Sequence, residues 1–85
     1  MQNFTYTIAD AAGVHVRPAG ELVELAQTFA CNLEIDAGGR RASLKKLFAL
    51  MGLAIEHGQE VTVTASGQDE QQAIAAIQKF FTENL

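Results

Sequence analysis

Four short stretches of the chain alternate apolar with polar residues, a pattern typical of half-buried β-strands. The fourth stretch, Val-Thr-Val-Thr-Ala, is also rich in β-branched residues, which favours a strand. Gly38 and Gly39 separate the second stretch from the third and predict a hairpin turn between two neighbouring strands. The predicted strands cover residues 4–8, 33–36, 40–42 and 61–65.

Three other segments carry apolar residues at helical spacing. Pro18 favours the start of the first helix, because the first turn does not need its missing N–H group. Ser43 is the expected N-cap of the second helix, which we predict to run to about residue 53, and Asp69 is the expected cap of the third. The buried stripes are Leu22, Leu25, Ala26 and Phe29 in the first helix and Ile74, Ile77 and Phe81 in the third.

The predicted order is strand, helix, strand, strand, helix, strand, helix. Short connections favour an α+β fold with one four-stranded antiparallel sheet and three helices packed on one of its faces. The other face, which carries the threonines at 5, 7, 62 and 64, is expected to be wetter. A chain of 85 residues has room for one core, so we expect a single domain over residues 1–85.

Charge and composition exclude several classes of protein. The 6 basic and 10 acidic residues give a net charge of −4, which argues against a protein that binds duplex nucleic acid through a basic face. Aromatic residues make up only 7% of the chain, too few for a base-stacking surface. The longest apolar run, residues 47–55, is too short for membrane insertion, and no secretory signal precedes it. We therefore expect a cytoplasmic protein.

Cys31 is the single cysteine, so no intrachain disulfide is possible. Its apolar neighbours favour a small buried side chain, and no activating base or cation stands beside it in the sequence. The chain has no Cys-x-x-Cys motif of the kind that binds metals, and we expect neither a metal site nor a cofactor.

Candidate chemistry is concentrated in residues 13–19, Gly-Val-His-Val-Arg-Pro-Ala. The backbone N–H groups of Val16 and Arg17, at the predicted helix start, offer a site for an anion, and the Arg17 side chain adds a permanent cation. A neutral imidazole is a good nucleophile, so His15 in this setting suits a covalently held phosphoryl group. From the residues alone, a histidine that merely occupies a loop or caps the helix remains an alternative.

The same motif resembles the phosphorylation-site signature of the HPr family, the histidine phosphocarriers of the bacterial sugar phosphotransferase system. The likeness extends over essentially the whole chain, including the Gly38-Gly39 hairpin and the stretch from Val61 to Glu70. The resemblance implies an open-faced β-sandwich and a covalent carrier of phosphate that is not itself an enzyme.

The resemblance also implies roles for particular residues. His15 would accept phosphate on Nδ1 from phosphorylated enzyme I and pass it to enzyme IIA domains, with Arg17 assisting at the phosphate. The chain end at Leu85 would lie close to this site. A monomer suits a shuttle that meets two partners in turn.

The second predicted helix has more apolar residues than one buried stripe needs: Leu44, Leu47, Phe48, Leu50, Met51 and Leu53. An exposed remainder suits a transient partner surface, and the resemblance implies Leu47, Phe48 and Met51 as docking residues. The alternative is that all six belong to the core.

Basic residues cluster between positions 17 and 46 and predict a locally basic docking face that includes Lys45 and Lys46. An ordinary solvated cluster is the alternative. Glu24 and Gln27 stand where many family members carry lysines that face acidic enzyme I, which weakens the expected complementarity.

Lys46 also stands where Gram-positive members of the family carry a regulatory serine. Lysine cannot accept that phosphate, so we predict no serine switch at this position. Ser43 lies nearby, but we interpret it as the N-cap.

The favoured function is a general phosphocarrier for sugar uptake. The alternative within the family is a regulatory paralogue of the nitrogen-related phosphotransferase branch. A small ferredoxin-like or RNA-binding module shares a similar element order. The acidic charge and the few aromatic residues argue against RNA binding, and the missing Cys-x-x-Cys motif argues against a metal chaperone.

Overall fold

A computed structural model describes the whole chain, residues 1–85, and contains seven regular elements. Their order confirms the one predicted from the sequence. In chain order they are β1 (Gln2–Thr7), α1 (Val16–Ala26), β2 (Asn32–Ala37), β3 (Arg40–Ser43), α2 (Leu47–Met51), β4 (Glu60–Ser66) and α3 (Glu70–Asn84).

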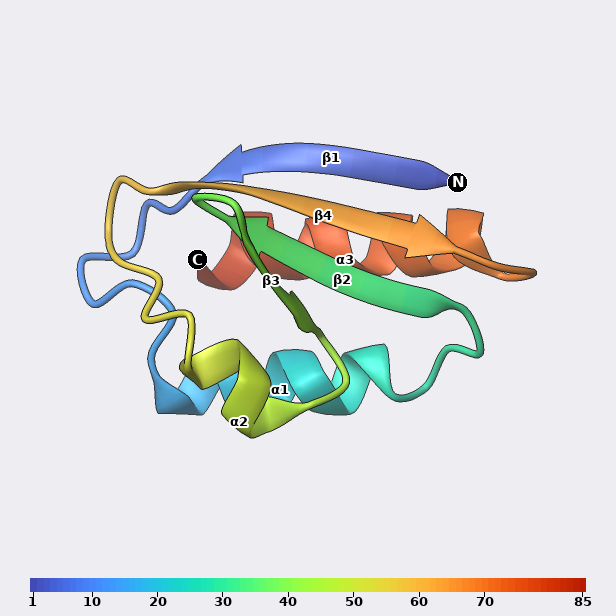
Figure 1. Cartoon of the computed structure of the whole chain (residues 1–85), viewed down its shortest axis with the longest axis horizontal. Coiled ribbons are helices and arrows are strands. Elements are labelled where there is room, and N and C mark those ends of the chain that lie inside the picture. The colour runs from blue at the N-terminus through green and yellow to red at the C-terminus, as the bar shows by residue number, and fades with distance from the viewer.

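The four strands form one antiparallel sheet in the order β1-β4-β2-β3, so the last strand in sequence lies between the first and the second (Figure 1). Val63 of β4 pairs with Phe4 of β1 and with Ile35 of β2, and this register places all three side chains on the same buried face. Side chains alternate between faces along a strand, so the threonines fall on the opposite face. There Thr5 and Thr62 pair across strands, with their hydroxyl oxygens 3.3 Å apart, and the predicted wetter face is confirmed.

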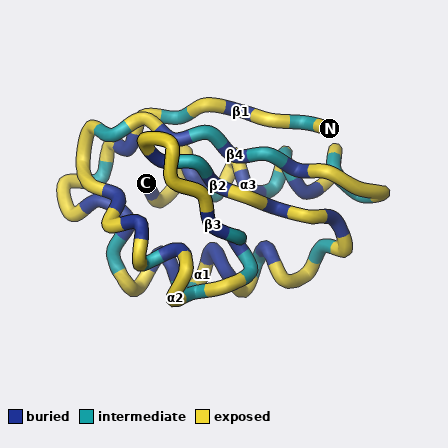
Figure 2. The backbone as a smooth tube through the Cα atoms, viewed as in Figure 1, coloured by how far each residue is buried: buried dark blue, intermediate teal, exposed yellow.

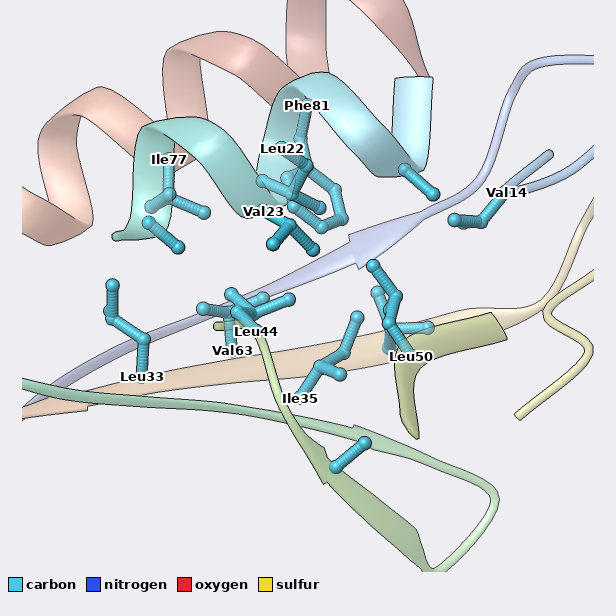
Figure 3. Packing of buried hydrophobic residues seen from close by; sticks show 14 of the residues in the cluster. Val14, Leu22, Val23, Leu33, Ile35, Leu44, Leu50, Val63, Ile77 and Phe81 are labelled. Atoms are coloured by element: carbon cyan, nitrogen blue, oxygen red, sulfur yellow. The ribbon is translucent and has the colours of Figure 1, made fainter. Parts of the chain in front are cut away.

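The helices cover one face of the sheet, and the core lies between the two layers. Figure 3 shows side chains of α1 and α3, such as Leu22 and Ile77, directed toward Leu33 and Ile35 of β2. Phe81 of α3 is fully buried and meets the rings of Phe4 and Tyr6 edge to face, with centroids 5.4 and 5.6 Å apart. In Figure 2 the buried positions recur along the helices and strands, whereas the loops at one end of the molecule are mostly exposed.

The prediction that Ser43 caps the second helix is wrong. Ser43 is the last residue of β3, where it pairs with Glu34 of β2, so the strand continues one residue beyond its predicted end. The Ser43 hydroxyl accepts a hydrogen bond from the Lys45 N–H at 3.1 Å and stabilises the turn that follows. Helix α2 begins only at Leu47, with Lys46 in the N-cap position, and it ends at Met51 rather than near residue 53.

Asp69 occupies the predicted N-cap position of α3, but its side chain does not cap that helix. The carboxylate instead accepts hydrogen bonds from the backbone N–H groups of Ala30 and Cys31, at 2.8 and 2.9 Å. The segment after α1 is thereby tied to the start of α3. Phe29, expected in the first helix, lies in this segment beyond the end of α1 at Ala26.

Candidate functional site

A tightly turned loop connects β1 to α1 and fixes the place of His15. Gly13 has φ +68°, and its N–H donates to the Asp10 carbonyl at 2.9 Å. The next residue, Val14, is buried and donates its N–H to the Ile55 carbonyl at 3.0 Å. A Cβ atom at position 13 would lie 2.4 Å from that carbonyl oxygen, so the close approach of the two loops requires glycine here.

His15 is the N-cap residue of α1 and has an extended backbone, with φ −93° and ψ 175°. Its carbonyl accepts the first helical hydrogen bond, from the Ala19 N–H at 3.0 Å, while its imidazole caps nothing and remains 41% exposed. The N–H groups of Val16 and Arg17 donate to no protein acceptor, and Pro18 has none to donate. The helix start therefore presents two free donors next to an accessible imidazole.

A shallow hollow of about 200 Å³ lies at this helix start. It brings His15 and Arg17 together, as predicted, and its lining residues come from the β1–α1 loop, α1 and α3. They are Asp10, His15, Arg17, Pro18, Glu21 and Asn84.

The last residues of the chain also reach this region. The Leu85 carbonyl oxygen accepts hydrogen bonds from the N–H groups of Ala9 and Asp10, at 2.6 and 2.8 Å. Leu85 is thus bound to the loop that precedes His15, and its neighbour Asn84 lines the hollow.

Asp10, Glu21 and Asn84 were missed by sequence reasoning. The Asp10 Oδ2 atom lies 3.8 Å from Nε2 of His15, within the range of an ion pair when the ring is protonated. A signal for Asp10 was present in the sequence, because an acidic residue that precedes a glycine turn is well placed to fold back toward the end of that turn.

The apolar residues in and around α2 divide into two groups. Phe48 is 90% exposed and Leu47 and Met51 are half-buried, so the hypothesis that all six belong to the core is wrong. The buried group comprises Leu44, Leu50 and Leu53. Helix α2 packs against α1, which carries another exposed apolar side chain at its start, Val16.

Three of the five cations of the predicted basic face make hydrogen bonds within the chain, but only one of them is paired with an opposite charge. Arg40 donates to the Gly52 carbonyl at 2.7 Å, and Lys45 donates to the Phe29 carbonyl at 2.6 Å. The third, Arg41, lies 3.3 Å from a carboxylate oxygen of Asp36. The remaining two, Arg17 and Lys46, are exposed and make no hydrogen bond or ion pair through their side chains.

Comparison with known proteins shows the family to which this arrangement belongs. The family model described as "PTS HPr component phosphorylation site" matches residues 2–83. The phosphocarrier protein HPr of Lysinibacillus sphaericus is 37% identical over 83 residues, which cover 98% of this chain and 94% of that protein.

Solved structures agree with the sequence matches. The histidine-containing phosphocarrier protein of a Mycoplasma superposes with a TM-score of 0.94 at 36% identity, covering 96% of this chain and 93% of that one. Crh of Bacillus subtilis, described as a domain-swapped dimer, has a TM-score of 0.78 at 30% identity, covering 94% of this chain and 92% of that one.

This chain and the solved structures it matches share one class of fold, a small domain with an open antiparallel sheet and three helices. The chain belongs to the HPr family of the phosphotransferase system. The predicted fold and family resemblance are thereby confirmed, and the names of the relatives do not favour the nitrogen-branch alternative. None of the helices combines the length and the apolar character that crossing a membrane requires.

Proposed function

We propose that this protein is a covalent phosphocarrier and not an enzyme in its own right. Nδ1 of His15 accepts a phosphoryl group from phosphorylated enzyme I, and an enzyme IIA domain then removes it for sugar uptake. The observation that carries the proposal is the exposed His15 side chain next to two free backbone donors and the Arg17 side chain.

The chemistry is an in-line phosphoryl transfer in two directions. The Nδ1 lone pair forms a bond to phosphorus while the bond that holds the phosphoryl group on enzyme I breaks, and its electron pair leaves with enzyme I. In the second step a nucleophile of the IIA domain attacks, and the electron pair of the N–P bond returns to Nδ1. The free N–H groups of Val16 and Arg17 and the Arg17 guanidinium stabilise the phosphoryl oxygens, because they are fixed donors that require little rearrangement.

The exposed side of α2 supplies the docking surface in this proposal. Phe48 offers a large accessible apolar side chain, and Leu47 and Met51 flank it at helical spacing. Lys46 contributes an unengaged cation toward acidic partners. Lys45 adds a second positive charge beside it, held in place by the hydrogen bond from its ammonium group to the Phe29 carbonyl.

A reconstituted transfer assay tests the proposal. The protein is mixed with enzyme I and phosphoenolpyruvate, and phosphate transfer is followed onto sugar-specific IIA domains and, in parallel, onto IIA domains of the nitrogen-related branch. Transfer to the sugar domains is expected. Transfer to the nitrogen-branch domains alone would support the regulatory alternative, and no transfer to either would contradict the carrier function.

We further propose that the carrier works in the cytoplasm as a monomer, since both partners must reach the same helix start. Size-exclusion chromatography with light scattering tests the oligomeric state over a range of concentrations. A stable dimer, as described for Crh, would contradict this part of the proposal.

A further inference from the structure

The geometry points to Asp10 as the positioning residue that holds the reactive tautomer of His15. The inference rests on the proposed phosphocarrier function, because it concerns which ring nitrogen is free to react. Its basis is the 3.8 Å separation between Oδ2 of Asp10 and Nε2 of His15.

The carboxylate of Asp10 is held in place by its own surroundings. Its Oδ1 atom accepts the Ala12 N–H at 2.8 Å, so only Oδ2 is left to face the imidazole. The backbone of Asp10 is fixed as well: its N–H donates to Leu85 and its carbonyl accepts from Gly13. The side chain is 31% exposed, and the hydrogen bond from Ala12 restrains the carboxylate beside the ring.

A carboxylate can only accept protons from a neighbour, and this property selects between the two neutral forms of histidine. With Asp10 facing Nε2, the form that carries its proton on Nε2 is favoured, and the lone pair is left on Nδ1. At 3.8 Å the two atoms are beyond hydrogen-bond distance, so the preference comes from the negative charge of Asp10 next to Nε2. Carboxylates that are hydrogen-bonded to reactive histidines fix the tautomer in the same sense.

The same contact serves both transfer steps. When Nδ1 bonds to phosphorus, the ring becomes a phosphoimidazolium that still holds its proton on Nε2, and the new positive charge lies against Asp10. When the N–P bond breaks, its electron pair returns to Nδ1 and the ring is neutral again, with the proton still on Nε2. No proton has to leave the ring or enter it during the cycle.

The other groups at the hollow do not duplicate this role. From α1, Arg17 brings a positive charge, which opposes a cationic ring, and Glu21 brings a carboxylate that forms no ion pair with His15. From α3, Asn84 is neutral, and its side chain donates to the Phe80 carbonyl. Asp10 is the carboxylate within ion-pair distance of the imidazole.

The Asp10→Asn variant tests the inference. The amide oxygen of the substituted side chain takes over the hydrogen bond from the Ala12 N–H, so the NH₂ group faces Nε2 and can only donate. The neutral ring is then driven toward the form with its proton on Nδ1. Asp36→Asn is a matched control, because Asp36 also accepts a backbone N–H through Oδ1 and faces a cationic group through Oδ2, on the distant sheet face.

Two readouts are needed. Nitrogen-15 NMR of the unphosphorylated ring measures the tautomer directly and does not depend on any phosphotransfer. We expect the Nε2–H form to dominate in the native protein and in Asp36→Asn, and its share to fall in Asp10→Asn. The second readout is the kinetics of phosphate uptake from enzyme I, where we expect kcat to fall about two- to fivefold with an unchanged KM, the scale of a solvent-exposed ion pair.

The outcomes separate the two claims. An unchanged tautomer in Asp10→Asn, with thermal stability equal to that of the control, would overturn the role of Asp10 whether or not phosphate is transferred. If the native protein takes up no phosphate on His15 but Asp10→Asn still shows the expected tautomer shift, the carrier function is overturned and the role of Asp10 in setting the tautomer stands.

Discussion

Phe48 and Leu50 lie two residues apart in α2, yet their side chains have opposite surroundings: Phe48 is 90% exposed and Leu50 only 1%. A two-residue step along a helix turns the side-chain direction by about 200°, which accounts for the contrast. The same short helix therefore anchors itself to the sheet through Leu50 and presents Phe48 outward. Packing and partner docking can be separated experimentally at these two positions.

The first prediction compares Phe48→Asp with Leu50→Ala. We expect Phe48→Asp to change the free energy of unfolding by less than about 0.5 kcal/mol, because no core contact is lost, and to slow phosphate uptake from enzyme I at least tenfold. Leu50→Ala is expected to cost about 2–5 kcal/mol of stability through the lost burial and the cavity left behind. Urea unfolding and transfer kinetics measure both. Unfolding caused by Phe48→Asp would contradict the assignment.

Much of the fold was predictable because it depends on local patterns. The alternating stretches around Phe4, Ile35 and Val63 mark the strands, and the Gly38-Gly39 pair marks the hairpin. The end of β3 was not predictable from local signals. Serine is a residue type that often caps helices, but Ser43 pairs with Glu34, nine residues earlier, and this pairing decides its conformation.

The candidate site shows the same division. His15, Arg17 and Pro18 lie within four consecutive residues, so their convergence at one helix start could be predicted from the local sequence alone. The hydrogen bonds of the Arg40 and Lys45 side chains could not be predicted in this way. Their acceptors are the carbonyl groups of Gly52 and Phe29, which come close to these side chains only in the folded chain.

The second prediction concerns acid stability and Asp69. The hydrogen bond from the Ala30 N–H, together with contacts from Cys31, lowers the pKa of this carboxyl below its ordinary value of 3.8. Because the pKa is lower in the folded state than in the unfolded state, the ionised carboxylate stabilises the fold above about pH 4, and this contribution is lost as pH falls through the folded-state pKa.

We therefore expect Asp69→Asn to be less stable than the native protein at pH 7, and the difference to shrink as the pH is lowered below about 4. Urea unfolding across this range measures it. Glu24→Gln, which removes an exposed carboxylate that accepts no hydrogen bond, is the control for the loss of one surface charge. A difference between Asp69→Asn and the native protein that is constant with pH would contradict the role of the charge.

The third prediction concerns regulation at the start of α2. Lys46 occupies the N-cap position of this helix and has no hydroxyl group to phosphorylate, while Ser43 belongs to β3 and its oxygen is engaged with the Lys45 N–H. Incubation with the kinase that phosphorylates the regulatory serine of HPr proteins, plus ATP, is expected to leave the protein unmodified by mass spectrometry. The Lys46→Ser variant serves as the positive control, and stoichiometric phosphoserine on the native chain would refute the prediction.

The fourth prediction addresses the central claim, that His15 carries the phosphoryl group. The native protein and His15→Ala are incubated with enzyme I and phosphoenolpyruvate, and acid-labile phosphate is counted by intact mass and located by peptide mapping under neutral conditions. His57, which is exposed in the loop before β4, supplies the internal control through His57→Ala. We expect one phosphate on His15 in the native protein and in His57→Ala, and none in His15→Ala. Phosphate that persists in His15→Ala would contradict the account.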